Sequence, residues 1–112
     1  MSVPVNLDMF ANTLADFGFG YLITVGDDFG AHTVAVDPVL TEGVLDAGPA
    51  GTTTRRNVVA HPHVTVIWPP RDPGGYTLIV DGRAELAGDA VRVHPTRAVL
   101  HRKRDDCMPL QK

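Results

Sequence analysis

Residues 52–57, with the sequence TTTRRN, combine side-chain types that can bind an anion. Three threonine hydroxyls precede Arg55 and Arg56, and the residues that follow, up to Pro62, have the pattern of a short helix. Hydroxyls and unpaired backbone N–H groups at a helix start favour negative charge, and arginine binds phosphate oxygens through two parallel hydrogen bonds. Together these groups fit a phosphate monoester.

The same segment also has a purely structural interpretation. Thr52 or Thr53 can cap the helix while Arg55 and Arg56 extend into solvent. Two cations at a helix start are unfavourable for the helix dipole unless an anion lies between them. Spacing alone leaves both interpretations open.

The histidines raise the question of a metal site, above all His61 and His63 in the sequence HPH. Pro62 separates the helix end from the next strand, and no carboxylate or third histidine lies nearby at ligand spacing. We therefore expect no metal site. The one cysteine, Cys107, excludes an internal disulfide and lies in a polar tail without an activating partner.

Three further side chains could contact a ligand. Trp68 and Tyr76 flank the proline-rich loop at residues 69–75, and their rings either stack on a flat ligand or close one end of the fold. His32 can donate a hydrogen bond or transfer a proton, or it is an ordinary strand residue. We find no serine–histidine–aspartate triad and no pair of catalytic carboxylates, so we assign no catalytic residue.

Short strands and turns must position these residues. Alternating apolar residues and turn signals predict six strands, at residues 20–26, 31–40, 44–47, 63–68, 76–87 and 91–93. Helices are predicted at residues 7–17, between the threonines and Pro62, and at residues 95–104, where Pro95 would open the helix.

Turn and cap residues refine this prediction. Asn6 can cap the first helix, Gly18 can end it in a left-handed conformation, and Gly82 predicts a bulge in the long strand. The strands do not alternate regularly with helices. We therefore predict an antiparallel barrel and not a doubly wound parallel sheet.

Composition limits the function classes. The 112 residues predict a single domain over 1–112, in which a large enclosed ligand cavity is hard to build unless two subunits share it. The net charge of −3 argues against nucleic acid, and no apolar run is long enough to span a membrane. Without a secretory leader or disulfides, we expect a cytoplasmic protein.

Three motifs within about residues 20–87 resemble those of the FMN-binding split-barrel family typified by pyridoxamine 5′-phosphate oxidase. In that family a Ser/Thr-Arg-Lys motif opens a short helix, Asn-Pro-x-Val begins the next strand, and a later strand carries Val-x-Gly-x-Ala. The matching residues are Thr54, Arg55 and Arg56, then His61, Pro62 and Val64, and finally Val80, Gly82 and Ala84.

The resemblance implies a mainly β fold, a six-stranded antiparallel split β-barrel with short flanking helices. It also implies a homodimer that holds FMN or a deazaflavin at the subunit interface, although some relatives hold haem or no ligand. The phosphate would be bound by Thr53, Thr54, Arg55, Arg56 and Asn57. The ring would lie along the second strand at His32, Val34, Ala35 and Val36, mainly through backbone groups. If Trp68 stacks on a flat ligand, this ring is the candidate.

The implied function is hydride or electron transfer to a small molecule. A rival interpretation is a binding or storage protein of the same fold, or a dimer without cofactor. The chain departs from the oxidases on the second strand, where they carry basic residues and this chain has His32, Thr33 and, further on, Asp37. Arg56 also replaces a lysine. It also lacks their C-terminal strand extension, so pyridoxamine phosphate is not carried over as substrate.

Overall fold

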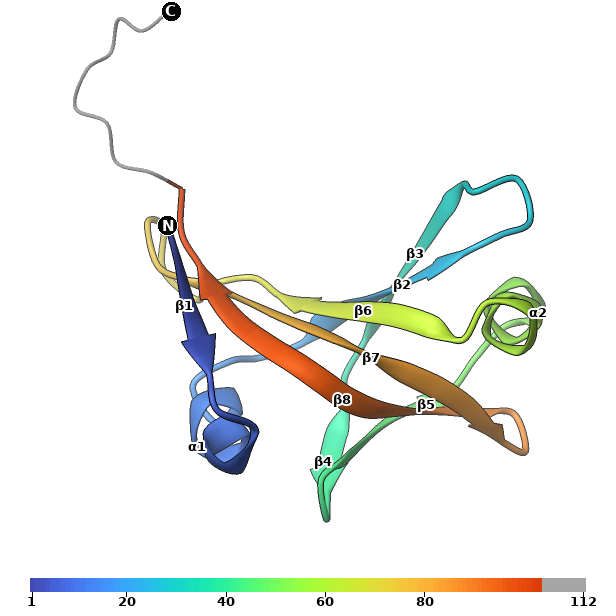
Figure 1. The fold of residues 1–112 in the computed structure, drawn as a ribbon, viewed down its shortest axis with the longest axis horizontal. Helices are drawn as coiled ribbons and strands as arrows, with labels where there is room; N and C mark the ends of the chain where they lie inside the picture. Colours follow the sequence, from blue (N-terminus) through green and yellow to red (C-terminus); the bar gives the residue numbers. More distant parts are fainter. Residues whose placement is uncertain (104–112) are drawn as a thin grey trace, which may run out of the picture.

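A curled antiparallel sheet makes up most of the molecule (Figure 1). The computed structural model describes residues 1–103, and within that range the sheet has eight strands. These are β1 (Ser2–Val5), β2 (Gly20–Val25), β3 (Ala31–Val36), β4 (Val39–Thr41), β5 (Val44–Pro49), β6 (His63–Trp68), β7 (Thr77–Ala87) and β8 (Ala90–His101). The helical segments are a 3-10 turn η1 (Leu7–Met9), α1 (Phe10–Leu14) and α2 (Thr52–Ala60).

The strand order explains the barrel-like shape. Hydrogen-bonded neighbours run β3-β2-β6-β7-β8-β5-β4, and β1 pairs with β8. Because β3 and β4 lie at opposite ends of this order but are joined only by Asp37 and Pro38, the sheet must curl upon itself. The predicted split barrel is therefore confirmed. It has eight strands instead of six, because β1 was not predicted and the predicted strand at 31–40 is divided at Pro38, which has no N–H for a ladder.

The predicted helix at residues 95–104 is wrong, because β8 continues as a strand to His101. Pro95 fits this strand at a bulge: Gly82 is opposite Pro95 and Asp81 is opposite Arg97, so Thr96 is the extra residue. The Thr96 hydroxyl donates a hydrogen bond to the Asp81 carbonyl over 3.1 Å. The bulge predicted at Gly82 is confirmed, and residue 104 and Cys107 lie outside the described residues.

The core lies inside the curl of the sheet. Its fully buried large side chains include Trp68, Leu22, Leu45, Leu78, Val66, Val80, Val91 and Val93. The segment at 7–17 forms η1 and α1 and covers one end of this core, where the Phe10 ring packs edge-on against Trp68 at 6.1 Å between centroids. None of the helices within residues 1–103 is long and apolar enough to cross a membrane.

The ends of the first helical segment test two further predictions. The Asn6 side chain accepts a hydrogen bond from the Asp8 N–H over 2.9 Å, so the predicted cap is confirmed. Gly18 is not in the left-handed region, so its predicted role is wrong. The segment ends after the short α1, and its last carbonyls accept from the N–H groups of Ala15, Asp16 and Phe17 without a left-handed glycine.

Candidate functional site

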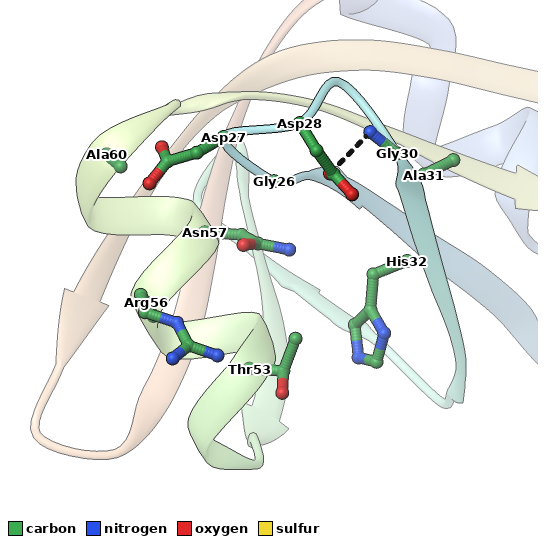
Figure 2. A pocket seen from close by; sticks show the side chains of 10 residues that line it. All are labelled: Gly26, Asp27, Asp28, Gly30, Ala31, His32, Thr53, Arg56, Asn57 and Ala60. Atoms are coloured by element: carbon green, nitrogen blue, oxygen red, sulfur yellow. Dashed lines mark hydrogen bonds between the residues drawn. The ribbon is translucent and has the colours of Figure 1, made fainter.

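A cleft of about 490 Å³ separates α2 from the hairpin of β2 and β3 (Figure 2). We call it the α2–hairpin cleft. Residues of both elements line it: Gly26, Asp27, Asp28, Gly30, Ala31 and His32 from the hairpin, and Thr53, Arg56, Asn57 and Ala60 from α2. The helix and the hairpin are distant in the sequence. The contact between α2 and β2 brings them together in the fold.

The N-terminus of α2 is not capped by a side chain. Gly51 is the N-cap residue, with extended backbone angles, so the predicted caps Thr52 and Thr53 are wrong. The threonines lie inside the first turn of the helix and not at the N-cap position, from which a side chain accepts a hydrogen bond from the first backbone N–H groups. The first helical hydrogen bond comes from the Arg55 N–H to the Gly51 carbonyl, which leaves the three preceding N–H groups without a helical partner. No acid lies in this turn.

The two arginines of α2 have different environments. The Arg55 guanidinium donates a hydrogen bond to the Ala50 carbonyl, and this side chain lines neither the cleft nor the smaller cavity described below. Arg56 lines the cleft, is exposed, and makes no ion pair with any residue of the range 1–103. Of the predicted pair, Arg56 alone has a side chain that a ligand in the cleft would meet.

Asn57 fixes α2 to the barrel. Its side chain is only 6% exposed, and its Nδ2 donates to the Thr24 hydroxyl on β2 over 3.0 Å. Thr24 is itself fully buried. Since buried polar groups must be paired, this bond sets the position of α2 relative to the hairpin and thereby the width of the cleft.

The residues predicted to line a cofactor ring lie in two places. His32, Val34 and Val36 share the half-buried face of β3, and Ala35 is on its exposed face. His32 points into the α2–hairpin cleft together with Thr53 (Figure 2). Val34, Ala35, Val36 and Thr54 instead line a smaller cavity of about 140 Å³, beside the end of β5.

The structure contradicts the predicted ligand contact of Trp68. Its side chain is fully buried in the core against Phe10, so its ring cannot stack on a ligand. Strand alternation explains this, because Val64, Val66 and Trp68 all point to the inner face of β6. Tyr76 is covered by the Arg102 guanidinium, 4.7 Å from the ring centre.

Sequence reasoning missed the acidic end of the cleft. Asp28 Oδ1 accepts from the Gly30 N–H over 2.9 Å, and Asp27 Oδ1 lies 2.8 Å from His61 Nε2 at the end of α2. The gap between the strands predicted at 20–26 and 31–40 implied a turn, but nothing in the sequence indicated that this turn would face α2. The cleft is therefore bipolar: Arg56 lies toward one end, and Asp27 and Asp28 lie at the hairpin end (Figure 2).

Two curated mycobacterial proteins are close relatives in sequence. They are the uncharacterized protein Mb0449c of Mycobacterium bovis and the uncharacterized protein MT0457 of Mycobacterium tuberculosis. Each is 46% identical over 114 residues, which covers 88% of this chain and 80% of the relative. No family model matches the chain.

Several solved structures have the same fold. An FAD-binding protein of Mesorhizobium loti has a TM-score of 0.69 at 14% identity, covering 90% of this chain and 99% of that one. An F420 reductase has a TM-score of 0.63 at 22% identity, covering 78% and 94%. A Clostridium acetobutylicum protein of the pyridoxinephosphate oxidase family has a TM-score of 0.65 at 12% identity, covering 88% and 91%. At these identities the likeness is one of fold.

Proposed function

The chain belongs to the same protein family as the two mycobacterial relatives and has the split-barrel fold of pyridoxamine 5′-phosphate oxidase-like proteins, and from that premise we propose that it binds a flavin-type cofactor in the α2–hairpin cleft. The function proposed is oxidation or reduction of a small molecule with that cofactor. The likeness in fold to an FAD-binding protein and to an F420 reductase supports a flavin or deazaflavin.

One observation carries the proposal: Thr53, in the first turn of α2, and Arg56, which makes no ion pair within residues 1–103, line the same cleft. The free N–H groups of the first turn, the Thr53 hydroxyl and the Arg56 guanidinium are all donors, and none of them has a carboxylate partner in residues 1–103. A phosphate is the group that such a donor set binds best. The residues present therefore fit the phosphate of FMN, FAD or F420.

The chain's own residues would bind and orient the cofactor. When bound, a flavin or deazaflavin ring supplies hydride transfer, for which the protein provides position and electrostatics. Arg56 and Thr53 would hold the phosphate, with Asn57 keeping α2 in place. The imidazole of His32 would donate a hydrogen bond to the cofactor or hold a proton at one of its ring nitrogens.

A second copy of the chain would complete the site. Strand β3 is at the edge of the sheet, so its outer backbone groups have no partner strand within residues 1–103. Ala31, Thr33 and Ala35 on this strand are exposed. A homodimer with cofactor at the interface would cover this edge and supply the enclosure that 112 residues do not provide alone.

The test is a titration of the purified protein with FMN, FAD and F420, followed by the fluorescence of each cofactor. Riboflavin, which lacks the phosphate, is the matched comparison. We expect micromolar binding of at least one phosphate-bearing cofactor and binding of riboflavin at least about tenfold weaker, since a hydrogen bond to a charged group contributes about 1.5–3 kcal/mol. Absence of binding by all of them would contradict the proposal.

A turnover assay separates the enzyme from a binding protein of the same fold. The reduced form of the cofactor that binds is mixed with a panel of quinones and nitroaromatic acceptors, and its oxidation is followed by absorbance. Acceleration over the free cofactor supports the oxidoreductase, whereas tight binding without acceleration for any acceptor supports a storage or carrier role.

A further inference from the structure

The outer half of the β2–β3 hairpin, residues 24–32, is attached to the rest of the molecule at few points. Strand β2 pairs with β6 only from Tyr21 to Ile23, and β3 is at the edge of the sheet. From Thr24 onward the two strands of the hairpin therefore pair only with each other within residues 1–103. This part of the hairpin forms one wall of the α2–hairpin cleft (Figure 2).

Two hydrogen bonds join this outer half to α2 and its C-terminal end, and they differ in burial. One bond, from Asn57 Nδ2 to the Thr24 hydroxyl, is buried and fixes the base of the segment. The other joins Asp27 Oδ1, in the turn, to His61 Nε2, at the C-cap of α2, over 2.8 Å. Within residues 1–103 no other hydrogen bond links residues 24–32 to another element.

The bond between Asp27 and His61 lies at the hairpin end of the cleft. Asp27 and Ala60, the residue before His61, both line the cleft, so this bond joins its two walls. An ionised carboxylate only accepts hydrogen bonds, so the imidazole donates from Nε2, either as the neutral tautomer protonated there or as imidazolium. The side chains of His61 and Asp27 are 38% and 90% exposed, so water can replace either partner and the bond opens readily.

From this arrangement we propose that residues 25–31 form a flap beside the α2–hairpin cleft and that the bond between Asp27 and His61 is the latch that holds this flap closed. The flap turns about its Thr24 end, where Asn57 keeps the hairpin on α2. Opening of the latch widens the cleft, and a ligand enters and leaves through the opening. The role in ligand exchange rests on the proposed function, whereas the flap and its latch rest on the hairpin alone.

Residual dipolar couplings of the backbone amides test the flap in the ligand-free protein. They are measured on the ¹⁵N-labelled full-length chain for the wild type, Asp27→Ala, His61→Ala and the double variant. In the wild type, we expect the couplings of residues 25–31 to fit the orientation of β6 and β7. In each variant they should fall, because the flap then averages over several orientations. The double variant should lose no more than either single variant, since the two side chains act through one bond.

Asp89→Ala is the matched control. Asp89 is an exposed aspartate between β7 and β8, it makes no ion pair within residues 1–103, and its replacement removes the same charge. The couplings of this variant should equal those of the wild type. Flap couplings that are unchanged in Asp27→Ala, or that fall equally in Asp89→Ala, would overturn the inference and leave the proposed phosphate site standing.

Release of a bound cofactor tests the role in ligand exchange. FMN, FAD and F420 are each dissociated from the protein by dilution, and stopped-flow fluorescence gives the rate. Dissociation from Asp27→Ala should be about two- to fivefold faster than from the wild type, the change expected for one exposed bond, with Asp89→Ala unchanged. Equal rates would overturn the role in exchange. If none of the three binds, that role fails together with the proposed function, while the couplings still decide whether the flap exists.

Discussion

Asn57 is the residue on which the geometry of the cleft depends most. Its Nδ2 bonds the fully buried Thr24 hydroxyl and ties α2 to β2, and the residue also lines the cleft. Arg56, one residue earlier, is exposed and free to meet a ligand. A buried residue that holds α2 in place and an exposed arginine therefore stand next to each other on this helix.

A double-mutant cycle on Asn57 and Thr24 should reveal this bond. Asn57→Leu or Thr24→Val alone leaves a buried polar group without a partner and should lower the free energy of unfolding by about 1–3 kcal/mol. The double variant should lose less than the two single losses together, because neither polar group remains. Urea denaturation measures all three, and strictly additive losses would show that the bond contributes nothing.

Glu85 and His94 provide a pH test away from the cleft. The hydrogen bond and charge of His94, with Nε2 at 2.8 Å from Glu85 Oε2, hold the pKa of the Glu85 carboxyl below its ordinary value. A lowered carboxyl pKa stabilises the fold above the unfolded-state pKa, and this contribution is lost as pH falls through the folded-state pKa. Both side chains are about half exposed, so the effect on stability is small.

The His94→Ala variant should therefore shift the pKa of the Glu85 carboxyl upward, toward the value of a free glutamate. Carbon-13 NMR of the carboxyl group during an acid titration measures this shift, with Glu42 as the internal control. An unchanged Glu85 titration would show that His94 is not the cause.

At the scale of elements, the sequence allowed correct prediction of α2 and of the strands that surround it. Alternation in β6 and the long β7 is strong, and Pro62 ends the helix before β6 begins. The residues after Pro95 were predicted as a helix because proline often opens one. In the structure a bulge accepts the proline, and pairing with β7 and β1, contacts distant in sequence, determines the strand.

Gly82 permits that bulge, and replacing it should destabilise the sheet. A Cβ at residue 82 would lie 2.6 Å from the His94 carbonyl oxygen and 2.8 Å from Val93 Cγ1, so the backbone of β8 must move. We expect Gly82→Ala to cost about 1–3 kcal/mol, as overpacking does. The urea midpoint measures the loss, with Gly18→Ala as control, and equal midpoints for the two variants would contradict the expectation.

At the scale of the molecule, the position of the cleft could not be predicted from sequence. The residues of the motif TTTRRN were identified, but their division between two cavities depends on which way each side chain points from α2. Likewise the facing hairpin, with its two aspartates, reaches α2 only through the curl of the whole sheet. Long-range pairing of this kind leaves no local pattern in the chain.

The free edge at β3 leads to a prediction about assembly. If a second copy covers this edge, light scattering after gel filtration should give twice the chain mass of 12.0 kDa at micromolar concentration. Introducing a charge on the exposed face of β3, as in Thr33→Lys, should shift the mass toward one chain and weaken cofactor binding in parallel. A monomer that binds cofactor with full affinity would contradict the shared site.

The affinity of FMN for the wild type, Arg56→Ala and Arg83→Ala tests the central claim most directly. Both variants remove one exposed arginine, but Arg83 is on β7 and does not line the cleft, so the net charge changes equally. Isothermal titration should show binding to Arg56→Ala weakened at least about tenfold, the loss of about 1.5–3 kcal/mol expected for a bond to phosphate, with Arg83→Ala unchanged. Equal affinities for the wild type and both variants would show that the α2–hairpin cleft does not hold the phosphate.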